Sequence, residues 1–475
     1  MGSSSLLPAQ VSIVIIGAGP TGLALACTLL NKGVPPTSVL IIERESINQK
    51  QARMYQSRAI GIAARTLECM AESIDDSSSP TPVRPIKSSL PVNSLDANES
   101  IKSTVQTILN RSQIVERMEI RERGREKPLL ISELSLLKDE TRYPFMTLCP
   151  QASTESIIES RFHTLGGTLY REWSLESFDN VDERSIGDSF EIKVVNPTGT
   201  IAKVKTKILV GADGGRSKTR AGTSLEFVGY TYPDTLVLGD VKFKSIDWFM
   251  GPSGFQVTQY VGSSGMLLFI PLPDGLIRII ADDDHKRVVE AATMKELRAG
   301  GNSEDRKVPT EEELQSIVRA RGPILAPEDD RNTITSVTWA SRFHIAHRIV
   351  PTFAKGPVCL IGDAAHVHSP AGGQGMNTGI QDAISLGLVL SEYFQLNSIL
   401  NPSASQSLTQ KLWVWSTKRH ATASNVLASA NFLTRTRSLR NPILVWIRRQ
   451  FWAILSFFPS LMKRQMRQLM GLNYR

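Results

Sequence analysis

A glycine-rich turn near the start of the chain has the spacing of a dinucleotide-binding site, Gly17-x-Gly19-x-x-Gly22. It follows an apolar run, Val11 to Ile16, that predicts a strand buried on both faces of a parallel sheet, and it opens a helix-like stretch from Leu23. In such a turn the first glycine permits the tight bend, the second lets the backbone approach a pyrophosphate, and the third lets the helix pack closely. The helix N-terminus then supplies N–H donors to the phosphates.

A carboxylate completes this unit. Val39 to Ile42 is a second apolar run, and Glu43 follows it, where its side chain can accept hydrogen bonds from the hydroxyls of an adenosine ribose. Strand, turn, helix and acid in this order predict a dinucleotide site. The turn alone does not distinguish FAD from NAD(P).

Two later segments place an aspartate just after a buried strand. Ile208 to Gly211 leads into Asp213-Gly214, and Val358 to Ile361 leads into Gly362-Asp363. A second glycine-rich helix start, Gly375-Met376-Asn377, comes soon after the second pair. The positive end of the dipole of a helix that starts there would stabilise negative charge on a ligand.

The order of the elements predicts an α/β (α+β) protein. A Rossmann-type domain of discontinuous segments is expected at residues 1–85, 145–225 and 345–400. Strand candidates such as Leu236 to Val241, Met266 to Pro271 and Leu276 to Ile280 predict an inserted mixed β-sheet domain at 86–144 and 226–344. Thr310 to Arg319 has the acidic first turn of a capped helix. Residues 401–475 are expected to form C-terminal helices.

The three nucleotide motifs, in this order, closely resemble those of the FAD-dependent aromatic hydroxylases, the para-hydroxybenzoate and phenol hydroxylase type. The resemblance covers nearly the whole chain and extends to Gln56-Ser57-Arg58-Ala59-x-Gly61 and to Trp339-x-Ser341-Arg342-Phe343. It implies a group A flavoprotein monooxygenase, without the thioredoxin-like C-terminal domain of the phenol hydroxylase branch. One departure from the family pattern is the helix segment that starts at Asp382, so helix packing beside the flavin is expected to differ.

The resemblance also implies roles for individual residues. Glu43 binds the ribose of FAD, Asp363 binds its ribityl chain, and Gln151 touches its linker region. Arg58 lies near the flavin and the pyrophosphate and helps to admit the nicotinamide cofactor. Pro370 faces the substrate beside the isoalloxazine ring.

The implied reaction uses two cofactors and O2. Asp213 and Gly214 serve both FAD and NADPH (or NADH), and backbone groups around Gly375, Met376 and Asn377 stabilise negative charge at the N1–C2=O edge of the flavin. The nicotinamide reduces the flavin, and O2 then forms a C4a-hydroperoxide that hydroxylates an aromatic, phenolic or polyketide-like substrate. This secondary-metabolism type of oxidoreductase is the leading hypothesis. A flavin-dependent epoxidase or another oxidoreductase acting on an apolar isoprenoid is the alternative, and a non-enzymatic flavin-binding protein is a third class.

A general base for the phenol is harder to identify from the sequence. His366 and His368, close to Pro370, are candidates, although a histidine at these positions more often serves the local fold. His344 and His347 lack a third ligand nearby, so they predict no metal site.

Composition limits the remaining possibilities. The chain has 475 residues, a formal charge of +8 and four well-separated cysteines. These features predict a cytoplasmic protein with reduced thiols, without a signal peptide or transmembrane segment, as a monomer or homodimer. The absence of a zinc-finger or helix-turn-helix pattern argues against a nucleic-acid partner. The C-terminus is basic, and the stretch from Ile443 to Phe458 is interpreted as a helix that covers the flavin domain, with contact to a membrane surface as the alternative.

Overall fold

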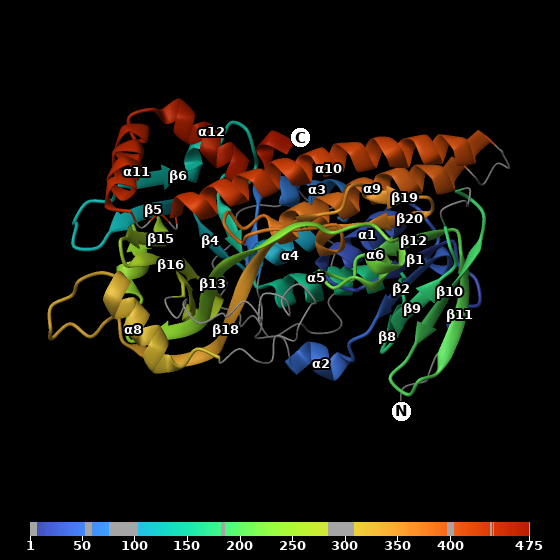
Figure 1. The fold of residues 1–475 in the computed structure, drawn as a ribbon, viewed down its shortest axis with the longest axis horizontal. Helices are drawn as coiled ribbons and strands as arrows, with labels where there is room; N and C mark the ends of the chain where they lie inside the picture. The colour runs from blue at the N-terminus through green and yellow to red at the C-terminus, as the bar shows by residue number, and fades with distance from the viewer. Residues whose placement is uncertain are drawn as a thin grey trace.

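The structure is a computed structural model, which describes residues 7–52, 59–75, 103–181, 186–283, 308–396, 403–437, 439 and 441–474. Two sheet regions lie side by side, and the long helix α10 (Ser403–Arg437) runs along both of them (Figure 1). The α/β architecture predicted from the sequence is confirmed.

The first region is a six-stranded sheet with β1 near its centre. Its order is β19-β20-β12-β1-β2-β8, and all neighbours are parallel except β19 and β20. The strands are β1 (Ile13–Ile16), β2 (Val39–Glu43), β8 (Leu169–Arg171), β12 (Ile208–Gly211), β19 (Ala354–Lys355) and β20 (Val358–Leu360). As expected for a doubly covered parallel sheet, all four residues of β1 are buried.

Each face of this sheet has a different cover. Ile13 and Ile15 point into a core that four helices share with α10 and with residues 105–109 and 466–472, whereas Val14 and Ile16 pack against a small antiparallel sheet. The helices are α1 (Pro20–Asn31), α3 (Ala64–Ser73), α5 (Gln151–Thr164) and α9 (Gly375–Leu396), and the strands of the small sheet are β9 (Ser174–Phe178), β10 (Phe190–Val195) and β11 (Ile201–Thr206). Strand β11 pairs with β10, and the chain then passes directly into β12, which joins the parallel sheet.

The second region is a nine-stranded, largely antiparallel sheet of order β21-β18-β13-β17-β16-β15-β5-β6, with β14 paired to β15. Its strands are β5 (Arg117–Glu122), β6 (Leu130–Glu133), β13 (Val228–Phe243), β14 (Met250–Gly251), β15 (Gly254–Gly262), β16 (Gly265–Pro271), β17 (Ile277–Asp282), β18 (Ile334–Ile349) and β21 (His366–Val367). The three strands predicted between Leu236 and Ile280 are therefore confirmed. Helix α8 (Glu311–Arg321) packs on one face, and Thr310 caps it by accepting a hydrogen bond from the backbone of Glu313, as predicted.

Shorter elements join the two regions. They are α2 (Ile47–Ala52), β3 (Gly61–Ile62), α4 (Thr104–Asn110), β4 (Gln113–Val115), β7 (Met146–Leu148) and α6 (Lys218–Gly222). Strands β3, β7 and β4 form a small sheet of their own. Strand β21 lies just after Asp363 and pairs with the end of β18, so the third nucleotide motif is tied directly to the large sheet.

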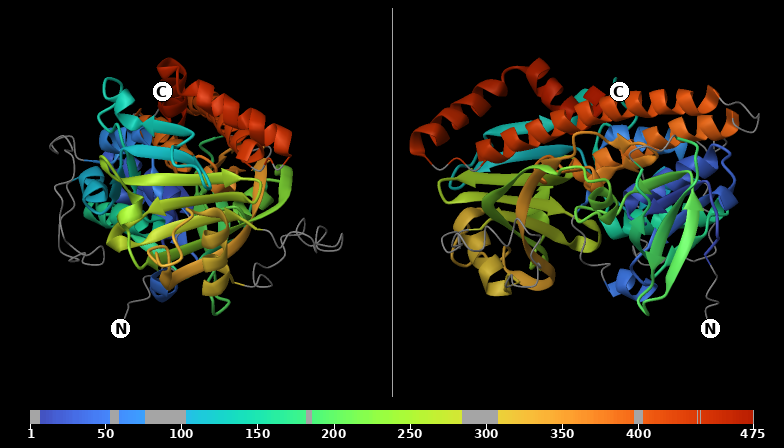
Figure 2. Two further views of the ribbon diagram at one scale, coloured as in Figure 1. Left: turned by 90° about the vertical axis from the view of Figure 1, so that its left-hand side faces the viewer. Right: turned by 45° about the vertical axis from the view of Figure 1, so that its right-hand side comes forward.

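The C-terminal helices α11 (Pro442–Leu455) and α12 (Pro459–Leu469) lie at the end of the molecule that carries β5 and β6 (Figure 2). The expectation that α11 covers the flavin domain is wrong: its buried residues Trp452 and Leu455 pack with Leu129, Leu130 and Val261 of the large-sheet region. Only the end of α12 and the residues after it reach the parallel-sheet core. No helix among the described residues is long and apolar enough to cross a membrane.

Candidate functional site

The first glycine turn has the geometry that its spacing predicts. Gly17 has φ +104°, and a Cβ there would overlap the carbonyl oxygen of Ala212. A Cβ on Gly22 would overlap the carbonyl oxygen of Gly17, so the helix sits as close to the turn as glycine allows. A Cβ on Gly19 would meet no atom within 4 Å, which leaves that stretch of backbone open to a ligand.

Glu43 is held beside this turn by backbone N–H groups. Its carboxylate accepts hydrogen bonds from Ala18 (2.8 Å) and Glu45 (2.9 Å), one on each oxygen. Each oxygen keeps a second lone pair, because a carboxylate offers about four acceptor sites. The acid that ends β2 is therefore fixed at the mouth of the turn with acceptor capacity to spare.

The first and third motifs meet at one side chain, Thr21, in the first turn of α1. A Cβ on Gly362, whose φ is +58°, would lie 2.9 Å from the Thr21 hydroxyl, and one on Gly379 would lie 2.6 Å from it. Gly379 is in the first turns of α9, so the N-terminal parts of α1 and α9 and the loop after β20 are in direct contact. Asp363 follows Gly362 and is exposed at this junction.

The second motif lies beside the first, but its aspartate is turned inward. Asp213 accepts hydrogen bonds from the Ser217 hydroxyl and from the backbone (3.0 Å) and hydroxyl (3.1 Å) of Thr219, so its carboxylate closes the start of α6. This structural role was not predicted from the sequence. Gly214 has φ +80°, and the space beside its Cα is open.

Arg220 joins the second motif to the third. Its guanidinium donates to the carbonyl oxygens of Gly215 (2.8 Å) and Ala364 (3.0 Å), and it lies 3.9 Å above the ring centroid of Phe227. Burial lowers the pKa of Arg220, and the two carbonyl bonds and the ring face compensate its charge.

The start of α9 presents free donors to the junction. The backbone of Thr378 is the first to bond back, to the Gln374 carbonyl (2.8 Å), so the N–H groups of Gly375 and Met376 precede the helical pattern. The side chain of Asn377 is buried and fully used: it donates to Gly373 (2.7 Å) and accepts from Ala63 (2.8 Å).

The bonds of Asn377 also fix β3 in place, because its amide donates to the Gly61 carbonyl (2.9 Å). The segment before β3 includes Arg58, which lies outside the described residues. Gln151, at the start of α5, exchanges hydrogen bonds with Ala59 through its backbone (3.0 Å) and its side chain (3.4 Å). Pro370 is exposed, and its carbonyl accepts from Gly373 (2.9 Å) in the loop before α9.

A buried ionic cluster beneath this loop was not predicted. The Asp382 carboxylate accepts from Arg419 Nε (2.6 Å), contacts His366 Nε2 (2.7 Å), and accepts from the backbone of Gly362 (3.2 Å). Burial raises the pKa of Asp382, but the charges of Arg419 and His366 outweigh it and hold that pKa below its usual range. The cluster joins α9, α10 and the third motif. Nothing in the sequence spacing pointed to Arg419 as a partner.

His368 has a different environment from His366. Its Nδ1 lies 2.8 Å from the Ser369 carbonyl, which can only accept, so Nδ1 carries the proton. Burial lowers the pKa of His368 to about 4, so the ring is neutral at pH 7. Its Nε2 is buried without a hydrogen-bond partner among the described residues.

Two other histidines, His347 and His344, contact residues of the large sheet. Tyr230 stacks on His347 with ring centroids 5.1 Å apart, and the hydroxyls of Tyr230 and Tyr232 both donate to Asn431 on α10. His344 instead contacts the Thr235 hydroxyl (3.3 Å). Within the part of the chain that the structure describes, no group of three or more potential ligands could hold a metal ion.

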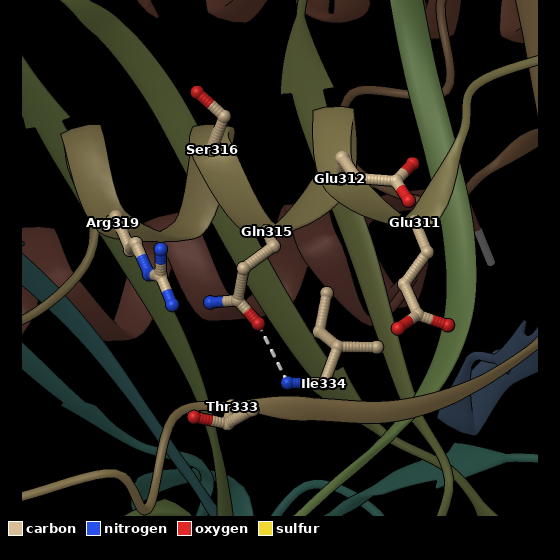
Figure 3. Close-up of a pocket in the computed structure, with 7 residues that line it drawn as sticks. All are labelled: Glu311, Glu312, Gln315, Ser316, Arg319, Thr333 and Ile334. Atoms are coloured by element: carbon tan, nitrogen blue, oxygen red, sulfur yellow. Dashed lines mark hydrogen bonds between the residues drawn. The ribbon is translucent and has the colours of Figure 1, made fainter.

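A pocket beside α8 is separate from these motifs. Glu311, Gln315 and Arg319 line it from the helix, and the Gln315 side chain accepts a hydrogen bond from the backbone of Ile334 (2.7 Å; Figure 3). None of the motif residues lines it, and it has no part in the site.

The junction fits FAD. The open backbone at Gly19, the acid Glu43, the exposed Asp363 and the N-terminus of α9 belong to four segments that the contacts above bring together. They offer in turn donors for a pyrophosphate, an acceptor for a ribose, an acceptor for a polyol chain, and a positive helix end for an electron-rich ring.

Comparison with known proteins agrees with this geometry. A family model described as "FAD binding domain" matches residues 10–428. The chain belongs to this family. FAD, not a nicotinamide nucleotide alone, is therefore the cofactor of the Rossmann-type turn, and the predicted resemblance to FAD-dependent aromatic hydroxylases is confirmed.

Relatives of this family member are longer proteins. Pentachlorophenol 4-monooxygenase of Sphingobium chlorophenolicum is 27% identical over 395 residues, which cover 80% of this chain and 58% of that protein. The 6-methylpretetramide 4-monooxygenase of Streptomyces rimosus is 27% identical over 436 residues, 91% of this chain and 63% of that protein. The chain thus spans about three fifths of the length of these curated relatives.

A solved structure shows the same fold over the full length. The p-nitrophenol 4-monooxygenase of Pseudomonas putida superposes with a TM-score of 0.73, covering 98% of this chain and 99% of that one at 18% identity. At this identity the match supports the fold alone.

Proposed function

We propose that the protein is an FAD-dependent monooxygenase that uses NAD(P)H and O2 to hydroxylate an aromatic, phenolic or polyketide-like substrate. The contact of the α1 and α9 N-termini with the loop before Asp363 is the observation that carries this proposal, because it brings the first motif, the third motif and the start of α9 to one place. The curated relatives named above act on pentachlorophenol and 6-methylpretetramide, and these names favour hydroxylation of a ring over the alternative of an isoprenoid epoxidase.

We propose that FAD occupies the domain built from residues 1–85, 145–225 and 345–400. Gly17, Gly19 and Gly22 shape the pyrophosphate turn, and Glu43 and Asp363 accept hydrogen bonds from the ribose and the ribityl chain. Bound FAD would carry electrons from NAD(P)H to O2 and supply the oxygen-transfer chemistry. The N–H groups at Gly375 and Met376 would stabilise negative charge on the ring, while Asn377 holds the helix start in place.

The substrate would bind between this domain and the large sheet, in residues 86–144 and 226–344. Pro370 would form part of the wall beside the flavin. Gln151 and Arg58 would lie near the cofactor, with Arg58 helping to admit the nicotinamide. Asp213 would act through its loop, because its own carboxylate is bound by Ser217 and Thr219, and Gly214 would offer the open backbone next to it.

His368 is the proposed contact for the substrate hydroxyl. Its neutral ring has its lone pair on the unpartnered Nε2, so it would accept a hydrogen bond and orient the phenol. A pKa of about 4 makes it too weak a base to hold a proton at pH 7. His366 is the poorer candidate for this role, because its Nε2 contacts Asp382 and its side chain is only 1% exposed.

We also place the protein in the cytoplasm as a monomer or homodimer. The proposed function is tested with the purified full chain. We expect a yellow protein that releases flavin on denaturation and oxidises NAD(P)H when phenols or aromatic polyketides are added, with little peroxide formed. Colourless protein that takes up no added FAD, or NAD(P)H oxidation that yields only peroxide with every substrate tried, would refute it.

A further inference from the structure

The positive charge of the chain is concentrated in its C-terminal part. No residue after Glu392 is acidic, whereas 12 are Lys or Arg. The part up to Glu392 therefore holds 42 of the 54 basic residues against all 46 acidic ones, and is slightly negative. The net charge of +8 is thus a property of the C-terminal helices, and it points to an anionic partner for that region.

The same region carries an uncovered apolar surface, named here the α11 face. Its members are apolar side chains on α11, the following turn and the start of α12, each between 44% and 80% exposed: Ile443, Leu444, Trp446, Ile447, Phe451, Ile454, Phe457, Phe458 and Leu461. Isolated exposed apolar residues are ordinary, but a continuous group with three phenylalanines and a tryptophan marks an interaction surface.

The α11 face is not the side of the helix that packs on the protein. Trp452 and Leu455 occupy that side, in the cluster with Leu129 and Val261. Arg448 is also on it, where its guanidinium donates to the Thr436 carbonyl (3.0 Å) and lies 5.1 Å from the Trp452 ring centroid. Figure 1 shows α11 at the outer edge of the molecule, beside β6, and its exposed apolar side chains are other residues than the ones that pack on the sheet.

Basic residues lie next to the α11 face. Arg464 follows it on α12 and is exposed. Three others are partly neutralised by acids of the large-sheet region: Arg449 by Glu122 (3.4 Å), and Lys463 and Arg467 by Glu140. The helices themselves contribute no acidic residue to this surface.

We propose that the α11 face docks the protein on an anionic lipid bilayer. An apolar helix side rich in Trp and Phe, bordered by Arg and Lys, enters the boundary between headgroups and acyl chains, while its charges meet anionic headgroups. A second copy of the chain is a poorer occupant, because a two-fold contact through this face would bring two positive regions together. This docking is independent of the proposed activity.

Vesicle co-sedimentation of the full chain loaded with FAD tests the proposal. The vesicles contain phosphatidylcholine alone, or with phosphatidylserine at about a third of the lipid. We expect binding to the anionic vesicles that weakens as salt rises. Trp446→Ser should weaken it about tenfold or more, and Arg464→Glu about tenfold. Trp413→Ser is the matched control, since Trp413 is equally exposed but lies on α10.

The outcomes separate the alternatives. Binding that Trp446→Ser abolishes and Trp413→Ser preserves supports the proposal. Absence of binding to anionic vesicles at low salt, or equal loss in both tryptophan variants, overturns it. A dimer in light scattering that Trp446→Ser converts to a monomer, without vesicle binding, would assign the face to a second copy instead. NAD(P)H oxidation is measured on the same samples, so a failure of the proposed activity is seen separately.

Discussion

Replacing Asp382 by Asn should couple a loss of stability to a loss of flavin. The carboxylate neutralises Arg419 in a buried site that it shares with His366, and breaking such a pair costs about 3 to 5 kcal/mol because a buried charge is left without its counter-ion. Asn keeps the size and one acceptor oxygen, so the expected loss of unfolding free energy is about 3 kcal/mol. The Gly362 backbone also loses a charged acceptor, next to the ribityl-binding aspartate. One such hydrogen bond is worth about 1.4 kcal/mol, or about tenfold in FAD affinity.

A second buried ion pair provides the control. Asp240 accepts two hydrogen bonds of 2.7 Å from Arg278 within the large sheet, away from the nucleotide motifs. Asp240→Asn should therefore lower the unfolding free energy by a similar amount while leaving FAD affinity unchanged. Urea unfolding and FAD titration of both variants make the comparison. Wild-type FAD affinity in Asp382→Asn, or equal loss of affinity in both variants, would show that the cluster does not position the third motif.

Three further changes test other parts of the site. The free energy of unfolding should fall as the pH drops from about 6.5 toward 4. His368 has a folded pKa of about 4, so the unfolded chain takes up the proton at a higher pH than the folded chain. The slope is at most about 1.4 kcal/mol per pH unit, and urea unfolding at several pH values should show a flatter profile for His368→Gln. Gly19→Ala should leave the free energy of unfolding within about 0.5 kcal/mol of wild type, because the added methyl group meets no protein atom, yet it should weaken FAD binding. Gly22→Ala should lower the thermal stability of the apoprotein, because its Cβ would overlap a backbone carbonyl. Asp363→Ala should weaken FAD retention on gel filtration more than Asp213→Ala, which should mainly impair reduction by NAD(P)H and loosen α6.

Each of these has a contrary result. A pH profile that His368→Gln does not alter would place the titrating group elsewhere. Unchanged FAD affinity in Gly19→Ala would contradict the proposed position of the pyrophosphate beside the Gly19 backbone. Equal flavin loss in both aspartate variants would contradict the division of roles between the second and third motifs.

The sequence predicted those strands and turns whose conformation depends on a few neighbouring residues. The apolar runs of β1, β2 and β20 follow from burial on both faces, and the geometry of Gly17 follows from the spacing of its turn. The full 16-residue lengths of β13 and β18 were not predicted, because both strands are irregular, with register shifts along their pairing.

Long-range partners were beyond such patterns. Asn377 was predicted for its backbone, but its side chain joins Gly61 and Ala63 across most of the sequence. Asp382 was taken as a departure from a family pattern, and only the fold shows that Arg419 compensates it. Asp213 was expected to face a ligand, whereas the loop that follows turns it toward Ser217. In each case the decisive partner is set by tertiary packing, not by neighbours in the sequence.

The strand order of the parallel sheet has a consequence for synthesis on the ribosome. Strand β12 stands between β1 and β20, but β20 begins only at Val358, so β12 is an unprotected edge while the middle of the chain is being made. Thr21 likewise lacks its partner Gly379 until α9 has emerged. A nascent chain therefore cannot be stabilised by FAD before α9 has emerged, because mass action favours only a state that binds the ligand.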